Sequence, residues 1–284
     1  MSFLVTGGGG FVGRAVANEL CARGSDVVLL ARDGSRTAET AQALGVPAIS
    51  YRDLDQVPDL VARQEPDAVI HLAAQQTRAP RGAEQITALL EANVQLGALV
   101  LEGVRDSGAV VVQAMSYFQF RDGRPTAKSL YASTKEALRS IGAYYRQAGG
   151  VDVRDVVLYD NYGPDDPRDK LMPYLISSLA SDLEAVVGPL TQTLNLLHVD
   201  DVAAGLIAAA GAGAPAMMTV RAAEPTTVGA IIAAIEAASS RPLRVRVDED
   251  REFSDLPLHA GDWPLPPGWH PRVSLESGVA QLVP

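Results

Sequence analysis

A tyrosine and a lysine four residues apart form the pair in this sequence best suited to acid–base chemistry. The segment Tyr131-Ala-Ser-Thr-Lys135 places both side chains on one face of a helix. Because a neighbouring ammonium favours a phenolate, we expect Lys135 to lower the pKa of Tyr131 from about 10 towards the range useful for proton transfer. The alternative is a surface Tyr–Lys pair, but the chain has only three lysines, so chance rarely produces this spacing.

A hydroxyl group precedes this pair at a position that suits a ligand site. Ser116 lies fifteen residues before Tyr131 and directly follows the apolar run VVVQAM. A side chain at the carboxyl end of a parallel strand faces the ligand crevice of an open α/β sheet. Ser116 alone could be an ordinary turn residue; with Tyr131 and Lys135 it forms a candidate catalytic set.

A glycine-rich turn near the N-terminus predicts a dinucleotide site. Residues 6–13, TGGGGFVG, follow a strand-like run and precede an amphipathic, helix-like segment. Gly7, Gly10 and Gly13 would permit a tight turn, close approach of the backbone to a pyrophosphate and close helix packing. The helix N-terminus would then offer free N–H groups to the phosphates. The alternative is a plain glycine turn.

Strand-like and helix-like segments alternate over the first 160 residues, which predicts an α/β fold with a Rossmann-type, doubly wound parallel sheet. The expected strands are Ser2–Val5, Val27–Leu30, Ala48–Ser50, Ala68–His71, Val110–Ala114 and Val153–Tyr159. The expected helices are Arg14–Arg23, Ala38–Leu44, Leu54–Glu65, Glu84–Asp106 and Ser133–Gly149.

Proline becomes frequent after Gly163-Pro164, and the tail at 263–273 is too proline-rich for a central strand or helix. We therefore expect a dinucleotide-binding domain over 1–160, with return segments near 190–220. A smaller C-terminal, substrate-binding lobe would occupy most of 161–284.

Composition excludes several classes of protein. The 284 residues carry a formal charge of −10 and a pI near 4.9, which argues against nucleic acid as a partner. Residues 202–220 are uncharged but rich in Ala and Gly, so a helix, a loop and a strand near Met217–Val220 are expected rather than a membrane span. Cys21 cannot form an internal disulfide, the four histidines show no metal-ligand spacing, and no targeting signal is evident. We expect a cytoplasmic protein with no metal and no membrane partner.

With these motifs in order, the chain resembles the extended short-chain dehydrogenase/reductases, the nucleotide-sugar epimerases, dehydratases and ketoreductases. The resemblance covers nearly the whole length. It rests on TGGGGFVG, on DAVIHLAA (67–74), on Asn93, on Ser116, on YASTK, on NYGPDD (161–166), on LLHVDDVA (196–203) and on WHPRVSLESG (269–278).

The resemblance implies roles for individual residues. Tyr131 would be the acid/base, Lys135 would hold the nicotinamide ribose, and Ser116 would orient the reacting oxygen. The implied cofactor contacts are Gly7, Gly10, Phe11, Val12, Gly13, Arg32, Arg36, Asp53, Leu54, Leu72, Ala73, Ala74, Asn93, Tyr131 and Lys135. The implied substrate contacts are Gln75, Ser116, Tyr117, Asp160 and Asn161. By analogy with the family, a homodimer is expected.

Departures from the family pattern narrow the choice of reaction and substrate. Dehydratases carry an acidic pair directly after the hydroxyl of the catalytic set, whereas Tyr117 and Phe118 stand here. Asp160 occupies the place of an asparagine that holds substrate phosphate, and a carboxylate would repel a pyrophosphate. Either Asn161 or the Asp160 backbone takes that role, or the substrate is not a sugar nucleotide.

The end of the second expected strand favours NADP(H) over NAD(H), although NAD(H) stays open. The acid that would accept hydrogen bonds from the adenosine ribose is replaced by Ala31, and Arg32 follows. Arg32, assisted by Arg36, could bind a 2′-phosphate. Alternatively, Arg32 is a solvated surface residue and Asp33 reaches the ribose.

We therefore expect a ketoreductase that acts on a nucleotide-linked 4-keto-deoxysugar, with Tyr131 as the proton donor. A nucleotide-sugar 4-epimerase with tightly bound NAD is the alternative. Another carbonyl substrate and a non-catalytic NAD(P)-sensing regulator are further alternatives.

Overall fold

The computed structural model of the chain describes residues 1–77, 79–126, 128–249 and 259–283. Its contacts divide the chain into two compact units. The first consists of Met1–Leu158, Ala203–Val220 and His259–Trp269; the second consists of Tyr159–Val202, Arg221–Leu258 and His270–Pro284. In this division residues 259–269 belong to the first unit. Thr219 N–H, at the sheet's edge strand, donates to the Pro264 carbonyl (2.9 Å).

A seven-stranded sheet in the order β13-β8-β5-β4-β1-β2-β3 forms the centre of the first unit, and every neighbouring pair is parallel. The strand order runs outwards from β1 in both directions, which is the doubly wound arrangement. The predicted Rossmann-type fold is confirmed. The strands are β1 (Ser2–Thr6), β2 (Asp26–Arg32), β3 (Ala48–Tyr51), β4 (Ala68–His71), β5 (Val110–Ser116), β8 (Asp152–Leu158) and β13 (Met217–Val220).

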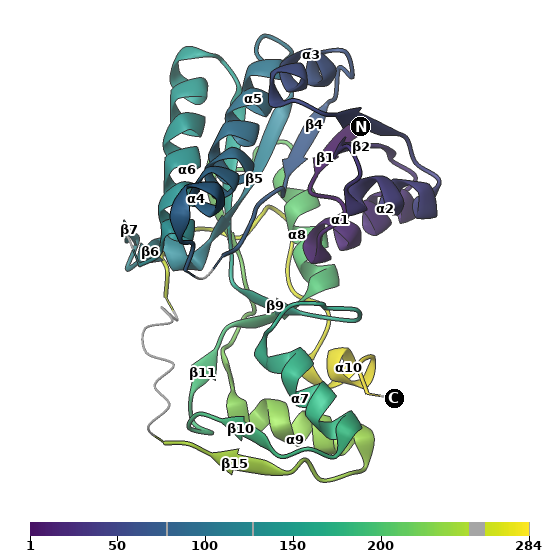
Figure 1. Ribbon diagram of the computed structural model, residues 1–284, viewed down its shortest axis with the longest axis vertical. Coiled ribbons are helices and arrows are strands. Elements are labelled where there is room, and N and C mark those ends of the chain that lie inside the picture. The colour runs from purple at the N-terminus through teal and green to yellow at the C-terminus, as the bar shows by residue number, and fades with distance from the viewer. Residues whose placement is uncertain (78, 127, 250–258, 284) are drawn as a thin grey trace. The chain divides into compact units, whose positions relative to one another are not determined.

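Helices cover both faces of this sheet (Figure 1). The helices α1 (Phe11–Ala22), α2 (Arg36–Leu44) and α8 (Val199–Ala209) lie on one side; α3 (Val57–Ala62), α4 (Gly82–Leu90), α5 (Leu96–Gly103) and α6 (Leu130–Ala148) lie on the other. On that second side Leu4, Val69 and Val111 of the sheet pack with Val100 of α5 and Tyr145 of α6. Each fully buried aliphatic side chain there contributes about 1.5–3 kcal/mol to folding.

Two predicted helices are interrupted. The segment expected as Leu54–Glu65 is a 3-10 turn, η1 (Leu54–Gln56), followed by α3, which has a proline near its start. The segment expected as Glu84–Asp106 is α4, then a π-helical turn η2 (Glu91–Gln95), then α5. π turns inside helices occur frequently at functional sites, because they redirect one side chain.

Among the described residues, one continuous helical run is long and apolar enough to span a membrane, Gly82–Gly103, with mean hydropathy 1.2. Its inward side chains Leu96, Val100 and Leu101 are buried in the sheet core. This run is therefore accounted for as a core helix. The uncharged stretch 202–220 forms most of α8, a loop and β13, as predicted.

The second unit is built from short strand pairs and three helices. Strand β9 (Asp160–Tyr162) pairs with β12 (Leu196–His198), β10 (Ala185–Val187) with β15 (Val245–Val247), and β11 (Thr193–Leu194) with β14 (Thr226–Thr227). The helices are α7 (Leu171–Ser181), α9 (Val228–Ser239) and α10 (Leu275–Ala280). Their core includes Leu175, Ile231, Ile235 and Val279. In the first unit, η3 (Tyr117–Gln119) and the hairpin of β6 (Phe120–Arg121) and β7 (Arg124–Pro125) follow β5.

Three of the sequence motifs meet inside the second unit. The buried Asp201 carboxylate accepts hydrogen bonds from the backbone N–H of Arg272 (3.0 Å) and of the next residue (2.9 Å). The ring of Tyr162 meets His198 edge-on at 5.3 Å, and a Cβ on Gly278 would collide with the Tyr162 hydroxyl. These residues of the NYGPDD, LLHVDDVA and WHPRVSLESG motifs thus fix the C-terminal segment in place.

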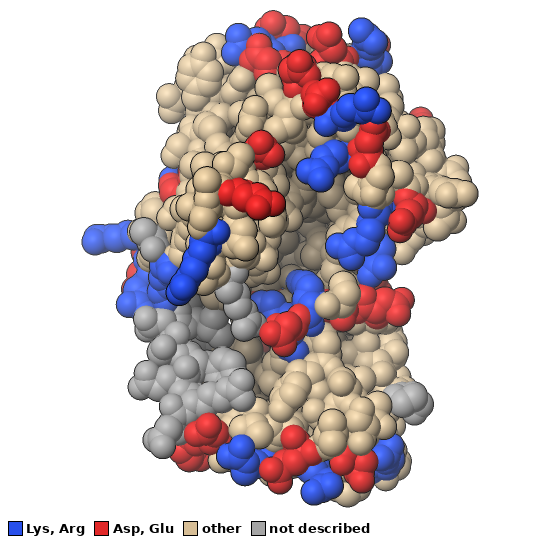
Figure 2. Space-filling model, in the orientation of Figure 1, with Lys and Arg blue, Asp and Glu red and all other residues tan. Residues whose placement is uncertain are grey.

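Acidic and basic side chains are interspersed on the face shown in Figure 2. Among the described residues, oppositely charged side chains form short-range pairs, such as Arg23 with Glu19 (2.7 Å) and Arg105 with Glu102 (3.1 Å). Exposed pairs of this kind contribute about 1 kcal/mol or less. The described residues on that face form no extended basic area.

Candidate active site

The glycine turn between β1 and α1 has the geometry of a phosphate cradle. Gly7 has φ +72°, and a Cβ there would lie 2.6 Å from the Ala73 nitrogen. Gly10 N–H donates to the Gly7 carbonyl (2.9 Å), and a Cβ on Gly13 would collide with that carbonyl. Helix α1 begins at Phe11 with no side-chain cap and no acidic residue in its first turn. Its first N–H groups therefore suit the pyrophosphate of a dinucleotide.

A buried threonine fixes the backbone opposite this turn. The Thr6 hydroxyl oxygen accepts hydrogen bonds from the N–H groups of Leu72 (3.2 Å) and Ala73 (3.1 Å). With both lone pairs used, its proton donates to His71 Nδ1 at 2.9 Å. Burial, assisted by the charge of Lys135, lowers the pKa of His71 to about 3 and keeps it neutral. Sequence analysis assigned no role to Thr6 or His71; their only signal is polarity at the ends of two apolar strands.

The π turn η2 aims Asn93 at the loop after β4. The side chain of Asn93 is fully buried. Its Oδ1 accepts from the Gln75 N–H (2.6 Å), and its Nδ2 donates to the Gln75 carbonyl (2.9 Å) and to the Thr134 hydroxyl of α6 (3.0 Å). Two predicted site residues, Asn93 and Gln75, are thereby brought together. Asn93 also joins this loop to the helix that carries Tyr131.

The predicted hydroxyl, phenol and ammonium converge. Ser116 is the last residue of β5, and Tyr131 lies in the first turn of α6, which Ser129 caps by accepting a hydrogen bond from the Ala132 N–H (3.1 Å). The side chains of Ser116 and Tyr131 are hydrogen-bonded to each other. Lys135, one helical turn later, is buried, and its Nζ donates to a carbonyl of β5 at 2.9 Å.

The expected direction of the Tyr131 pKa shift is wrong. Burial raises the pKa of Tyr131 to about 12, and the hydrogen bond to Ser116 only partly opposes this rise. The physical reason is desolvation, which disfavours the charged phenolate. The Lys135 ammonium donates to the carbonyl of Ala114, and burial lowers the pKa of Lys135 to about 8. The phenol is therefore held in its protonated form.

Two aromatic side chains follow Ser116 in the turn η3. Tyr117 is buried, and its ring lies 4.4 Å from the ring of Phe118. The Phe118 N–H donates to the Ser116 hydroxyl (3.3 Å), and the Ser116 N–H donates to Gln119 Oε1 (2.8 Å). No residue of η3 carries a carboxyl group. The involvement of Gln119 was not predicted.

Arginines gather at the carboxyl ends of β2 and β3. Arg32 ends β2, Arg36 begins α2, and both are exposed, whereas Ala31 is buried. The Asp33 carboxylate lies 3.8 Å from Nε of Arg52, a residue that the sequence did not suggest. Of the other predicted cofactor contacts, Val12 is half-buried in α1, Ala74 is exposed after β4, and Asp53 (exposed) and Leu54 (half-buried) lie at the start of η1.

Two predicted substrate residues belong to the second unit. The Asp160 carboxylate lies 3.2 Å from Nζ of Lys170. Asn161 Nδ2 donates to the Tyr159 carbonyl (3.1 Å), while its buried Oδ1 has no hydrogen-bond partner. Lys170 therefore offsets the negative charge that argued against a bound pyrophosphate at Asp160.

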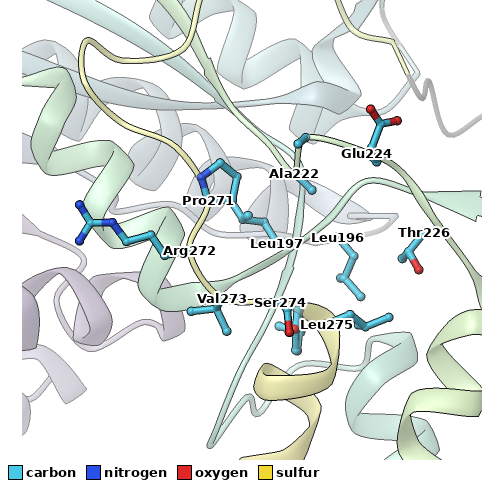
Figure 3. A pocket seen from close by; sticks show the side chains of 12 residues that line it. Leu196, Leu197, Ala222, Glu224, Thr226, Pro271, Arg272, Val273, Ser274 and Leu275 are labelled. Atoms are coloured by element: carbon cyan, nitrogen blue, oxygen red, sulfur yellow. The ribbon is translucent and has the colours of Figure 1, made fainter.

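The second unit also contains a pocket of about 330 Å³ (Figure 3). Leu196, Leu275 and Thr226 line it, with Arg272 at one end and Glu224 at the other. Its middle is apolar and its two ends are charged. In the described part of the chain, no group of three or more His, Cys, Asp or Glu side chains could hold a metal ion.

Comparison with known proteins places the chain in a family. The NAD dependent epimerase/dehydratase family model matches residues 3–218. A dTDP-4-dehydro-6-deoxy-D-allose reductase from a Streptomyces species is 26% identical, covering 87% of this chain and 84% of that protein. A dTDP-glucose 4,6-dehydratase from an Actinoplanes species is 27% identical over 100% of this chain and 97% of that protein.

Among solved structures, the UDP-glucuronic acid 4-epimerase of Bacillus cereus, in complex with UDP-glucuronic acid and NAD, has a TM-score of 0.80. That match is 20% identical and covers 99% of this chain and 98% of the other, so it concerns the fold. The family match spans most of the chain and includes every residue of the Ser116, Tyr131 and Lys135 set. The chain belongs to the NAD dependent epimerase/dehydratase family, the extended short-chain dehydrogenase/reductases, and is an oxidoreductase of that type.

Proposed function

We propose that this protein reduces a keto group on a nucleotide-linked deoxysugar, with Tyr131 as the proton donor. The observation that carries the proposal is the convergence of Ser116 at the end of β5 with Tyr131 in the first turn of α6, with Lys135 buried one helical turn further on. Reduction of a ketone needs a proton donor at the carbonyl oxygen, and a phenol held neutral supplies one.

The division of labour among the residues follows from their geometry. A nicotinamide held at this site would supply the hydride. Tyr131 then gives its proton to the oxygen of the reduced carbonyl, and Ser116 orients that oxygen through its hydroxyl group. Lys135, on the same helix face, would hold the ribose by its ammonium group and would stabilise the phenolate that is left after proton transfer. Thr6 and Asn93 hold the two loop segments that line the site.

NADP(H) is the proposed cofactor. Arg32 and Arg36 offer exposed guanidinium groups at the end of β2, where a 2′-phosphate would lie. The nearby Asp33 lies within ion-pair distance of Arg52, which reduces the repulsion of an anion. Titration of NADPH and NADH against the wild type and Arg32→Ala tests this choice, with Arg63→Ala, directly after α3, as an exposed control. Equal or tighter NADH binding by the wild type, unchanged in Arg32→Ala, would contradict it.

The proposed substrate class rests on the second unit and on the relatives. An anionic group such as a diphosphate would be favoured here for two reasons. Lys170 lies next to Asp160, and the first turn of α7 contains no acidic residue. The pocket of Figure 3 offers apolar surface beside Arg272. One relative is named as a reductase of a dTDP-linked 4-dehydro-6-deoxy sugar.

A nucleotide-sugar 4-epimerase is the second candidate, favoured by the likeness to epimerase folds crystallised with NAD. An epimerase must use its tyrosine first as a base and then as an acid, whereas a reductase uses it only as an acid. The nucleotide that co-purifies distinguishes the two. Tightly held NAD at full occupancy would support the epimerase, and an exchangeable NADPH site would support the reductase.

The decisive experiment is turnover of nucleotide-linked 4-keto sugars by the wild type and by Tyr131→Phe. We expect a loss of about 10²–10⁴ in rate. Tyr144→Phe, an exposed tyrosine of the same helix, is the matched control and should retain full activity. Wild-type turnover by Tyr131→Phe would refute the assignment of the proton donor.

We also propose a homodimer formed through α4 and α6. Ile86 and Leu90, one helical turn apart on α4, are 37% and 44% exposed, and Leu130 of α6 is 38% exposed. Light scattering of the wild type and of Leu90→Glu tests this. A wild-type monomer would exclude the dimer.

A further inference from the structure

The backbone of Ser116 is hydrogen-bonded to the side chain of Gln119, a residue that has no part in the proposed reaction. Gln119 is fully buried, and its Oε1 accepts a hydrogen bond from the Ser116 N–H at 2.8 Å. Its Nε2 donates to Glu136 Oε2 at 3.4 Å. Because an N–H donor lies at one end of the amide and a carboxylate at the other, the amide group has a single satisfied orientation.

The carboxylate at the far end of this link is itself fixed. Arg139, three residues further along α6, donates from Nε to both oxygens of Glu136 (3.1 and 2.9 Å) and from Nη2 to Oε1 (2.5 Å). The two side chains are 31% and 22% exposed. A two-pronged guanidinium–carboxylate pair constrains both position and plane. A continuous chain thus runs from α6 through Gln119 to the backbone of Ser116.

This chain acts on the hydroxyl group of Ser116 through the turn that follows. Ser116 is extended, with φ −130° and ψ 138°, and its hydroxyl oxygen accepts from the Phe118 N–H (3.3 Å). With one lone pair used in that way, the hydroxyl is oriented for its hydrogen bond with Tyr131. Gln119 closes the same turn from the other side, so its loss would free both the turn and the hydroxyl.

We propose that Gln119 and Glu136 are positioning residues that hold the Ser116 hydroxyl against the Tyr131 phenol. The kinetic consequence of this inference rests on the proposed reductase function, whereas its structural consequence does not. Neither residue needs to touch substrate or cofactor.

An exchange of the two side chains provides a sharp test. Glu136→Gln removes the charge and should lower kcat several-fold; Gln119→Leu removes the link and should lower it about tenfold, with KM changed little. Gln119→Glu alone sets two carboxylates face to face, so its activity should fall as the pH rises. The double variant Gln119→Glu, Glu136→Gln restores an acceptor towards Ser116 and a donor opposite it, and should recover most of the activity. Glu102→Gln, which alters another Glu–Arg pair three residues apart, is the control.

A second measurement needs no substrate. Tyrosine is replaced throughout by a fluorinated tyrosine, whose phenol is more acidic, and the fluorine signal that Tyr131→Phe removes is titrated by NMR. The hydrogen bond from Ser116 lowers the pKa of Tyr131. Gln119→Leu and Glu136→Gln should therefore raise the titration midpoint of that signal, and the exchanged double variant should return it towards the wild-type value.

The kinetic and the NMR measurements distinguish a failure of the proposed function from a failure of the positioning role. If no nucleotide-linked keto sugar is turned over but the midpoint moves as described, the proposed function fails and the positioning chain stands. If the Gln119 and Glu136 variants leave both kcat and the midpoint unchanged, the positioning role is refuted. It is also refuted if the double variant is as impaired as the sum of its single changes, because coupled residues must show an interaction energy.

Discussion

Replacement of Asp155 by asparagine should stabilise the protein more at pH 8 than at pH 5. Asp155 lies on β8 with its side chain 3% exposed; one carboxylate oxygen is 3.1 Å from Arg146 Nη2 and the other has no hydrogen-bond partner. Burial raises the pKa of this carboxyl to about 6, against the lowering effects of Arg146 and Arg139. The ionised Asp155 carboxylate therefore lowers the free energy of unfolding.

The magnitude follows from the pKa. A rise from 3.8 to about 6 corresponds to about 3 kcal/mol at 1.36 kcal/mol per pH unit. The folded state holds the Asp155 proton between pH 4 and 6 while the unfolded state releases it, so this group lowers stability as the pH rises through about 6. Between pH 5 and pH 8 the expected loss from Asp155 alone is about 1.4 kcal/mol.

The assay is urea unfolding of the wild type, Asp155→Asn and the exposed control Asp26→Asn at pH 5 and pH 8. The free energy of unfolding of Asp155→Asn relative to the wild type should rise by about 1.4 kcal/mol between these two pH values. Asp26→Asn should show no such rise. If the difference between Asp155→Asn and the wild type is the same at both pH values, the buried-charge explanation is wrong.

Three other outcomes are expected. Gly7→Ala should abolish dinucleotide binding and destabilise the fold, since its Cβ would meet the backbone of Ala73; cofactor fluorescence and thermal unfolding measure both. Asn93→Leu leaves the Gln75 N–H without its acceptor and should cost about 1–3 kcal/mol in unfolding free energy, measured by urea titration. Incubation with NAD and nucleotide-linked glucoses should yield no 4-keto-6-deoxy product by mass, because Tyr117 and Phe118 supply no acid or base.

Much of the sheet unit could be predicted from local pattern. The apolar runs that became β1, β2, β4 and β5 are buried on both faces, so each stands out as a continuous hydrophobic segment between polar turns. The breaks within α4–α5 and before α3 were missed, because the residues of a π turn and of a 3-10 turn are of the same types as those of an α-helix. The side-chain contacts of Asn93 that lie at one of these breaks come from residues 18 and 41 positions away.

The sequence by itself determined the doubly wound sheet and the glycine turn at Gly7, because both depend on spacing along the chain, and its resemblance to the family implied that Ser116 and Tyr131 act together. Tertiary structure alone decided the Thr6–His71 contact, the link from Gln119 to Glu136 and the direction of the Tyr131 pKa. Spacing predicted a phenol acidified by Lys135, but desolvation outweighs the hydrogen bond with Ser116 and raises the pKa of Tyr131. How much water a group loses depends on which distant segments pack over it, and no local pattern of residues records that.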